Sequence, residues 1–466
     1  MNNIAYDQIL KTLHEGLLNP VVHNEHLLQQ GSGSIQVDSR KVKPGDIFIT
    51  WTQYENEARK NGAQLVIGSS PTCDIQVSCG RSAWTWLCAA AYQHTHRKLT
   101  LLGITGTNGK TSTAWIASAL LRSAGRKVLT IGTLGAFFDE HTREPLIHTT
   151  PDPDVLFPLL QRAYEQQAIV VMEVSSHSIA QKKLIPLSFT GCAFTSFSQD
   201  HLDYHETMEN YWNTKWSFVK EAKHVALFEK LNRTLPHAVT YGYDKSSDLH
   251  LSHHDESLQL SCSFFEGKAH IPWLGVFAEQ NFAAAWLLAS FAGVILPSEM
   301  WHGSTIPGRM QKAHHCPDVF IDYAHTPDAL EQTLQSFTRK LSGKIIVLFG
   351  CGGDRDQEKR ALMGEVATRL ADTTVLTSDN PRSESPDRIL DDIQKGCSIP
   401  ITRISDRKAA IHFALQSANK NDIVILAGKG HETTQEVNGS RTPFDDVKIV
   451  QSYFQQKQDR DEINMA

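Results

Sequence analysis

The chain has 466 residues, of which 41% are hydrophobic and 21% charged, and its formal net charge is −6 at pH 7. A chain of this length is expected to form about three domains. The composition is ordinary for a globular enzyme, and the acidic balance argues against general binding to nucleic acid or to an anionic membrane surface. No apolar run reaches the ~18 residues of a spanning helix, and the eight scattered cysteines contain no CxxC pair. We therefore expect a cytoplasmic protein with reduced cysteines.

Residues 1–96 are expected to form a small N-terminal α/β domain. It begins with an amphipathic helical segment, and VDSRKVKPGDIFITW contains a strand beside Pro44 and Gly45. A helical SAWTWLCAAAYQHTH follows, and the charged HTHRK stretch at its end reads as a linker.

Two further blocks alternate strands with helices, as a doubly wound parallel sheet does. Residues 97–302 contain the strand-like runs LTLLGITG, KVLTIGTL, AIVVMEV, GCAFTSF and HVALFE. Residues 303–466 contain VFIDYAHT, IIVLFGCGG, TVLTSDN and DIVILAGKG. We predict a central P-loop ATPase-like domain and a C-terminal Rossmann-like domain, with ligands at the carboxyl ends of the strands.

The stretch 101–113, LLGITGTNGKTST, is built to hold the phosphates of a nucleotide. An apolar strand leads into a glycine-rich loop, and Lys110 opens a helical segment. Backbone N–H groups and the helix N-terminus would bind phosphates, Lys110 would reach the outer ones, and the Thr111 hydroxyl would bind Mg²⁺. The alternative is a glycine-rich turn without a ligand. The order of strand, loop, Gly-Lys-Thr and helix favours a nucleoside triphosphate.

Polar residues follow the next strands. Glu173 ends an apolar strand, where it either binds Mg²⁺ on the nucleotide or caps a helix. The run SQDHLDYH, with Lys215 further along, is either a metal-binding cluster or a polar loop whose lysine pairs with an acid.

Two motifs near the C-terminus, SDNPRSESP and AGKGHET, also follow predicted strands. Arg382 can hold a carboxylate bidentately and Glu432 can pair with an ammonium group. The alternative for the first motif is a turn that caps a helix.

These motifs resemble a known family. The wording TGTNGKT, with five residues between Gly103 and Gly109, is similar to the ATP loop of the Mur ligases and their folylpolyglutamate synthetase relatives, which join an amino acid to a carboxylate. GCGGDRD, SDNPRSESP and AGKGHET resemble the branch that adds meso-diaminopimelate to UDP-N-acetylmuramoyl-L-alanyl-D-glutamate in peptidoglycan precursor synthesis. The resemblance implies a three-domain, ADP-forming ligase that uses ATP and Mg²⁺ and an acyl-phosphate intermediate. We expect a monomer.

The resemblance also implies site residues. For ATP they are Gly106, Thr107, Asn108, Gly109, Lys110, Thr111, Ser112, Asn281 near adenine, Arg309 at the γ-phosphate and Asp322 at the ribose. For Mg²⁺ they are Thr111, Glu173, His201 and a carbamylated Lys215. Lys110, Lys215, His201 and Arg309 would be catalytic. The diamino acid would contact Arg355, Asp379, Asn380, Arg382, Gly428 and Glu432, and the acceptor Ser39, Thr149, Thr150, Ser176, Gln181 and Lys183.

The chain departs from the family pattern on the acceptor side. The stretch TWTQYENEA is shorter than the family's uridine-contacting stretch, and Lys183, Ser196 and Gln199 stand where other residues are usual. Two alternatives therefore stay open, namely a Mur-like ligase with another carboxylate acceptor and a non-catalytic ATP-binding protein. For the base that deprotonates the incoming amine, His205 and His325 are candidates.

Overall fold

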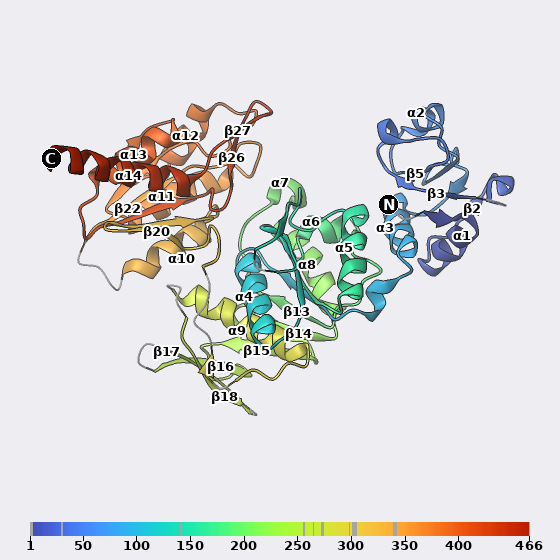
Figure 1. Cartoon of the computed structure of the whole chain (residues 1–466), viewed down its shortest axis with the longest axis horizontal. Coiled ribbons are helices and arrows are strands. Elements are labelled where there is room, and N and C mark those ends of the chain that lie inside the picture. The colour runs from blue at the N-terminus through green and yellow to red at the C-terminus, as the bar shows by residue number, and fades with distance from the viewer. Residues whose placement is uncertain are drawn as a thin grey trace.

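The computed structural model describes residues 3–28, 31–139, 141–254, 257–263, 265–271, 275–297, 299–300, 305–338 and 343–465. Three α/β domains follow one another along the chain, with the central domain between the other two (Figure 1). This confirms the predicted fold class. The predicted boundary between residues 96 and 97 falls within a 3-10 turn, η3 (Thr95–Lys98), and the one between 302 and 303 lies outside the described residues. No helix in these described ranges is long and apolar enough to cross a membrane.

The N-terminal domain is a five-stranded sheet flanked by helices. Its strands are, in spatial order, β2 (Val21–Val22), β7 (Ile75–Gln76), β6 (Leu65–Gly68), β5 (Ile47–Thr50) and β4 (Ile35–Gln36). Its helices are α1 (Tyr6–Glu15), α2 (Glu55–Lys60) and α3 (Gly80–Ala91). The sequences IFIT and LVIG make β5 and β6 buried on both faces, as central parallel strands are.

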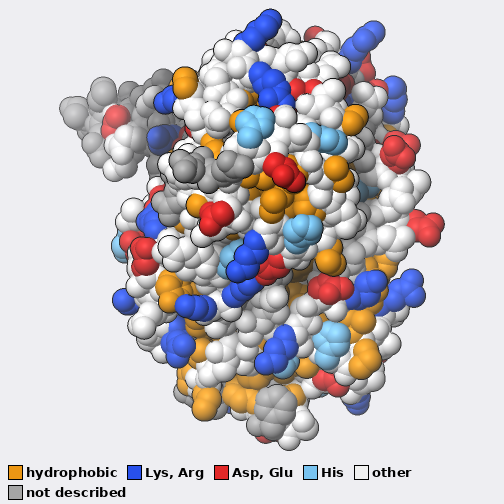
Figure 2. Space-filling view, turned by 90° about the vertical axis from the view of Figure 1, so that its right-hand side faces the viewer, with side chains coloured by type: hydrophobic (Ala, Val, Ile, Leu, Met, Phe, Trp, Pro, Cys, Tyr) orange, Lys and Arg blue, Asp and Glu red, His pale blue; other side chains and the backbone are white. Residues whose placement is uncertain are grey.

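On the face of the molecule seen in Figure 2, basic and acidic side chains are interspersed.

The central domain is built on a twelve-stranded sheet. Its strands are, in spatial order, β11 (Arg143–Glu144), β10 (Gly135–Phe137), β9 (Val128–Gly132), β12 (Ile169–Glu173), β8 (Leu101–Thr105), β13 (Gly191–Phe194), β14 (His224–Phe228), β15 (Ala238–Gly242), β16 (Leu249–His254), β17 (Ser257–Cys262), β18 (Phe265–Ala269) and β19 (Glu299–Met300). The strands from β9 to β16 are parallel, so their carboxyl ends share one edge.

Helices cover both faces of this parallel core. One face packs against α4 (Lys110–Ser123) and α9 (Val276–Phe291), and the other against α5 (Pro153–Glu165) and α8 (Met208–Lys220). Two short helices, α6 (Ser176–Ala180) and α7 (Leu202–His205), lie beyond the strand ends. The sequence did not predict the antiparallel extension from β16 to β18, which lies at the bottom of Figure 1.

The C-terminal domain has a six-stranded sheet, parallel except for its first edge strand. Its strands are, in spatial order, β20 (Gln311–His315), β21 (Asp318–Asp322), β25 (Ile423–Ala427), β22 (Ile345–Phe349), β23 (Thr373–Leu376) and β24 (Thr402–Arg403). One face packs on α10 (Pro327–Thr338), α11 (Glu358–Leu370) and α12 (Pro386–Gln394), and the other on α13 (Arg407–Ser417) and α14 (Asp446–Met465). A hairpin of β26 (Thr434–Val437) and β27 (Ser440–Pro443) stands outside the sheet. Strand β25 pairs between β21 and β22, so the loops that follow β21, β22, β23 and β25 leave the sheet at the same edge. Each of these loops carries one of the predicted motifs.

Candidate active site

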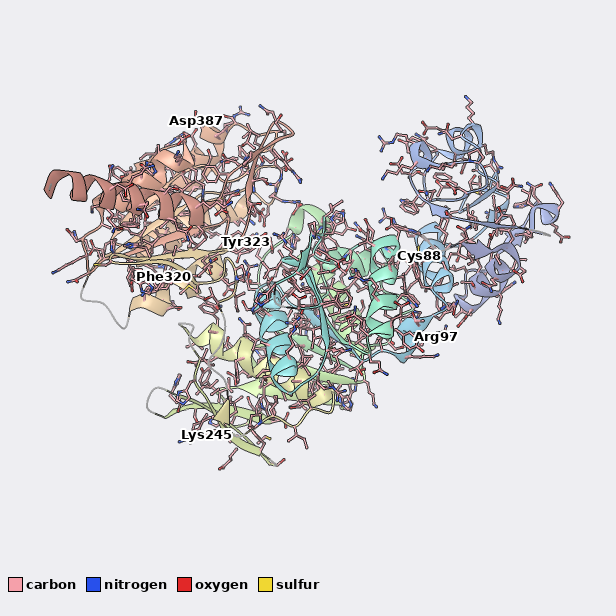
Figure 3. All side chains as sticks on the ribbon, viewed as in Figure 1. Cys88, Arg97, Lys245, Phe320, Tyr323 and Asp387 are labelled. Atoms are coloured by element: carbon pink, nitrogen blue, oxygen red, sulfur yellow. The ribbon has the colours of Figure 1, made fainter. Side chains whose placement is uncertain are left out.

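A cavity of about 1000 Å³ is lined by residues of all three domains. The loops after β8, β12 and β13 face the loops after β21, β22, β23 and β25 across it, and Trp51, Arg81 and Trp84 line its N-terminal end. Figure 3 shows Tyr323, one of the lining residues, where the C-terminal domain faces the central domain. Of the ATP, metal and substrate residues implied by the resemblance, all but Ser39 and Gly106 line this cavity. Of the two candidate bases, His325 lines it and His205 does not.

The nucleotide loop has glycine where its backbone requires it. Gly106 and Gly109 have φ values of +148° and +86°. A Cβ at Gly106 would lie 2.1 Å from Thr195 Oγ1, and one at Gly109 would lie 2.4 Å from Asn281 Oδ1. Helix α4 begins at Lys110, so the N–H groups of its first turn point to the loop. The Lys110 ammonium donates to the carbonyls of Gly106, at 2.9 Å, and Thr107, at 2.8 Å.

Oxygen ligands suited to Mg²⁺ lie beside this loop. Glu173, at the end of β12, is buried, and its Oε2 accepts a hydrogen bond from Thr111 Oγ1 at 3.0 Å. Arg309, from the C-terminal side, places Nη2 3.2 Å from the same Thr111 oxygen and lies over the Tyr323 ring. A hydroxyl, a carboxylate and a guanidinium therefore meet at one point, as a metal-bound phosphate requires.

Lys215, on α8, also contacts the nucleotide loop. It is buried, and its Nζ donates to the Gly106 carbonyl at 2.8 Å, the oxygen that also accepts from Lys110. Burial lowers the pKa of Lys215 well below its ordinary value, and the neighbouring Lys110 charge lowers it further. His201 Nε2 lies 3.3 Å from Asp200 Oδ2.

Among the residues that the structure describes, no group of three His, Cys, Asp or Glu side chains could hold a metal ion. A metal ion at this point would need other oxygens, such as the Thr111 hydroxyl, nucleotide phosphates or a modified Lys215.

The C-terminal domain contacts the nucleotide loop directly. Asn108 Nδ2 lies 2.9 Å from Asp328 Oδ2 and 3.3 Å from Thr326 Oγ1. Lys359 Nζ, on α11, lies 3.6 Å from Asp200. Sequence reasoning missed Lys359, because nothing in the run DRDQEKR distinguishes an inward lysine from a solvated one.

Two predicted residues at this boundary have protein partners. Both Asp322 oxygens accept backbone hydrogen bonds, from Met310 at 2.7 Å and Ala324 at 2.9 Å, so this carboxylate fixes the segment that carries Arg309. Asn281 accepts from Thr113 Oγ1 at 3.3 Å beneath Gly109.

The loops after β22, β23 and β25 form a cluster of charged side chains. Arg382 donates to the Gly353 carbonyl at 2.7 Å. Asn380 Nδ2 donates to Glu432 Oε2 at 2.7 Å, and that oxygen also lies 3.1 Å from Lys429 Nζ. Lys429 is fully buried, and the sequence did not reveal that it pairs with Glu432. The cluster offers both signs of charge to a ligand.

The N-terminal end of the cavity is aromatic and cationic. The rings of Trp51 and Trp84 stack at 5.7 Å, and the Arg81 guanidinium lies 5.0 Å from the Trp51 ring centre. Nearby, Lys183 Nζ pairs with Asp152 at 2.6 Å. Ser39, a predicted acceptor contact, lies outside the cavity because its hydroxyl bonds to Glu57 of α2.

The two histidines considered as bases are both engaged. His205 Nε2 lies 2.9 Å from Ser176 Oγ, and burial lowers the pKa of His205 to about 4. His325 Nδ1 lies 2.8 Å from the Tyr323 carbonyl, and burial lowers its pKa to about 4 as well. Both are therefore neutral near pH 7.

Comparison with known proteins identifies the class to which this site belongs. Residues 104–289 match the model of the Mur ligase middle domain, and residues 308–430 match that of the Mur ligase, glutamate ligase domain. The chain belongs to the Mur ligase family, as its motifs predicted.

Two curated relatives that match most of the chain share one particular name. The UDP-N-acetylmuramoyl-L-alanyl-D-glutamate–2,6-diaminopimelate ligase of Caldanaerobacter subterraneus subsp. tengcongensis is 38% identical over 451 residues, covering 89% of this chain and 92% of the relative. The ligase of the same name from Chromobacterium violaceum is 36% identical over 460 residues, covering 90% of this chain and 93% of the relative.

Solved structures agree with this placement. A structure of a ligase with that name has a TM-score of 0.64 at 29% identity, covering 98% of this chain and 99% of its own. A MurF ligase from Thermotoga maritima in complex with ADP shares the fold, with a TM-score of 0.61 at 16% identity, covering 92% of this chain and 98% of its own.

Proposed function

We propose that this protein is an ATP-dependent ligase that joins meso-diaminopimelate to UDP-N-acetylmuramoyl-L-alanyl-D-glutamate in peptidoglycan precursor synthesis. The observation that carries the proposal is a single cavity that brings together a nucleotide loop and the Arg382, Asn380 and Glu432 cluster. Relatives named for this reaction, 36% and 38% identical over most of the chain, support it. We also propose that the protein acts in the cytoplasm, in keeping with its scattered cysteines, and that it acts as a monomer.

ATP would bind with its phosphates in the loop 106–112 and its adenine near Asn281. Lys110 and Arg309 would contact the outer phosphates from the central and C-terminal domains. Thr111 and Glu173 would hold one Mg²⁺, and His201 with carbamylated Lys215 a second. When bound, these ions would neutralise phosphate charge.

The reaction divides into two transfers. The acceptor carboxylate attacks the γ-phosphorus and ADP leaves, giving an acyl phosphate. The neutral amine of diaminopimelate then attacks the acyl carbon, phosphate leaves, and a proton passes from nitrogen to a base. In this chain, Lys110 and Arg309 would oppose the charge that develops on phosphate, and closure of the C-terminal domain onto ATP would exclude water.

Phosphate release with defined substrates tests the proposal. Release that requires ATP, UDP-N-acetylmuramoyl-L-alanyl-D-glutamate and meso-diaminopimelate together supports it. Release with another acceptor supports a different Mur-like ligase, and no release with any combination supports a non-catalytic ATP-binding protein.

A different acceptor is the second candidate, favoured by the N-terminal end of the cavity. There Ser39 bonds to Glu57, and the wall is formed by the Trp51 and Trp84 rings with Arg81. Such a wall can bind many planar or apolar groups that carry an anion.

Replacing Lys215 by alanine is expected to lower turnover at least about 100-fold, because it removes the carbamate whose oxygen would bind the second metal ion. A short carboxylic acid such as acetate should partly restore turnover by supplying that oxygen. Lys220→Ala, an exposed change on the same helix, is the control. Full turnover of Lys215→Ala in a phosphate-release assay would remove the carbamate from the proposal.

Replacing Arg382 by methionine is expected to raise the KM for diaminopimelate by about 10- to 100-fold, since a charge-assisted contact to a carboxylate is lost. The KM for ATP should change less than twofold. Arg388→Met, exposed and outside the cavity lining, should change neither constant. Equal effects of Arg382→Met on both substrates would contradict its role in binding the amino acid.

A further inference from the structure

Two arginines reach the cavity from neighbouring loops. Arg355 follows β22 and Arg382 follows β23, and these two strands pair in parallel. Among the described residues neither guanidinium forms a close ion pair, and both interact electrostatically with the exposed Asp354 carboxylate. A Cβ at Gly352 would lie 2.9 Å from Arg382 Nη1 and 3.7 Å from Arg355 Cγ, so both side chains lie beside one glycine. Together they offer a site for carboxylate groups.

An ion pair between a buried arginine and a partly exposed glutamate joins these loops. Arg360, on α11, is 1% exposed and forms a bidentate pair with Glu384, with Nη2 2.8 Å from Oε1 and Nη1 2.9 Å from Oε2. The same Arg360 Nη1 lies 3.0 Å from Asp392 of α12. Glu384 therefore anchors the loop of Arg382 to two helices.

Glu384 also holds the loop of Arg355. Its Oε1 accepts a hydrogen bond from the Asp354 N–H at 2.5 Å. In return, Asp354 accepts from Ser383 Oγ at 2.7 Å and from the Ser383 N–H at 3.2 Å. The residues directly before Arg355 and after Arg382 are thus tied to each other by two carboxylates, that of Glu384 and that of Asp354.

We infer that Glu384, held by Arg360, is a positioning residue that sets the spacing of Arg355 and Arg382 and so the affinity for the carboxylates of the amino acid. The inference rests on the proposed function, because it concerns the amino-acid site of that reaction. Glu384 does not line the cavity, so it would act on the ligand only through the two loops that it holds. A bidentate charged pair fixes geometry more tightly than a single neutral hydrogen bond does.

The test replaces Glu384 by glutamine, which keeps the size of the side chain and removes its charge. The KM for diaminopimelate in phosphate release, and its Kd in calorimetry, should rise by about 10-fold or more. The kcat at saturating diaminopimelate and the KM for ATP should stay within about twofold. Turnover with lysine, which has no distal carboxylate, should change less than turnover with diaminopimelate.

A matched control is a second ion pair of α11. Arg369, at the other end of that helix, pairs with Glu331 of α10 at 3.0 Å, and neither residue lines the cavity. Glu331→Gln should leave every constant unchanged. If Glu384→Gln does not fold, Asp354→Ala, at an exposed position, removes the second tie and should raise the same KM several-fold.

The outcomes separate the inference from the proposed function. An unchanged KM and Kd for diaminopimelate in Glu384→Gln, or a parallel rise in the KM for ATP, would overturn the positioning role while leaving the ligase intact. A wild-type protein that binds diaminopimelate but releases no phosphate would overturn the proposed function, and the Kd comparison would still decide on Glu384. Wild-type protein that binds no diaminopimelate would overturn both.

Discussion

Replacing Lys110 by alanine is expected to abolish ATP-dependent ligation, with a loss of at least about 100- to 1000-fold in turnover. The reason is its place in the site. Its ammonium donates hydrogen bonds to the loop carbonyls of Gly106 and Thr107. From there it would reach phosphates that bind at the start of α4. The other lysines of the central domain that line the cavity, Lys183 and Lys215, lie outside this loop in the sequence.

Phosphate release measures the loss, and calorimetry with ATP and Mg²⁺ shows whether binding or turnover is affected. Lys127→Ala is the control, because Lys127 is exposed just beyond the other end of α4. Retained turnover in Lys110→Ala would refute the assignment of the loop to the outer phosphates.

The largest expected effect on stability comes from Arg407 and Asp446, which form an ion pair with both side chains fully buried. Arg407 donates Nε and Nη2 to the two Asp446 oxygens at 3.0 and 2.7 Å, and Nη2 also to the Ala427 carbonyl at 3.1 Å. Asp446→Asn leaves the guanidinium buried without a counter-charge. We expect it to lower the free energy of unfolding of the C-terminal domain by about 3–5 kcal/mol.

Amide hydrogen exchange of β25 and α14 measures this loss in the domain concerned, since separate domains need not unfold together. Asp391→Asn breaks a solvent-exposed pair with Arg403 in the same domain and should cost under about 1 kcal/mol. Equal protection of the two variants would show that the buried pair contributes no more than the exposed one.

The sequence predicted the parallel cores because their signal is local. Runs such as LLGIT and IVILA are almost entirely apolar, as is typical of strands covered on both faces, and glycines mark the loops after them. The motifs therefore fell at strand ends, and nearly every predicted site residue lines one cavity. The roles given to those residues stay predictions.

Other elements carried signals that were overlooked. In β16 and β17, Leu249, Leu251, Leu258 and Leu260 are buried and alternate with polar residues, which is the pattern of antiparallel strands. The hairpin of β26 and β27 turns at Asn438 and Gly439, both with positive φ, a pair typical of such turns.

The remaining features depend on partners far apart in the chain. The Ser39 hydroxyl donates to the Glu57 carboxylate, outside the cavity. Lys429 donates to the Asn380 side chain, which lies 49 residues earlier in the chain. Neither pairing follows from local spacing, since it depends on how strands order themselves in the sheet. The residue types alone could not show that these side chains pair with each other and are not simply exposed to solvent.

The loops that we propose to contact the amino acid all follow strands whose hydrogen-bonded pairing is complete behind them. β22, β23 and β25 keep their hydrogen-bonded register whatever side chains the loops carry. Exchanging a few loop residues can therefore retune which amine is accepted while the scaffold and the nucleotide half stay as they are. A lineage could change the chemistry of its cell-wall crosslinks in this way without redesigning the enzyme's core.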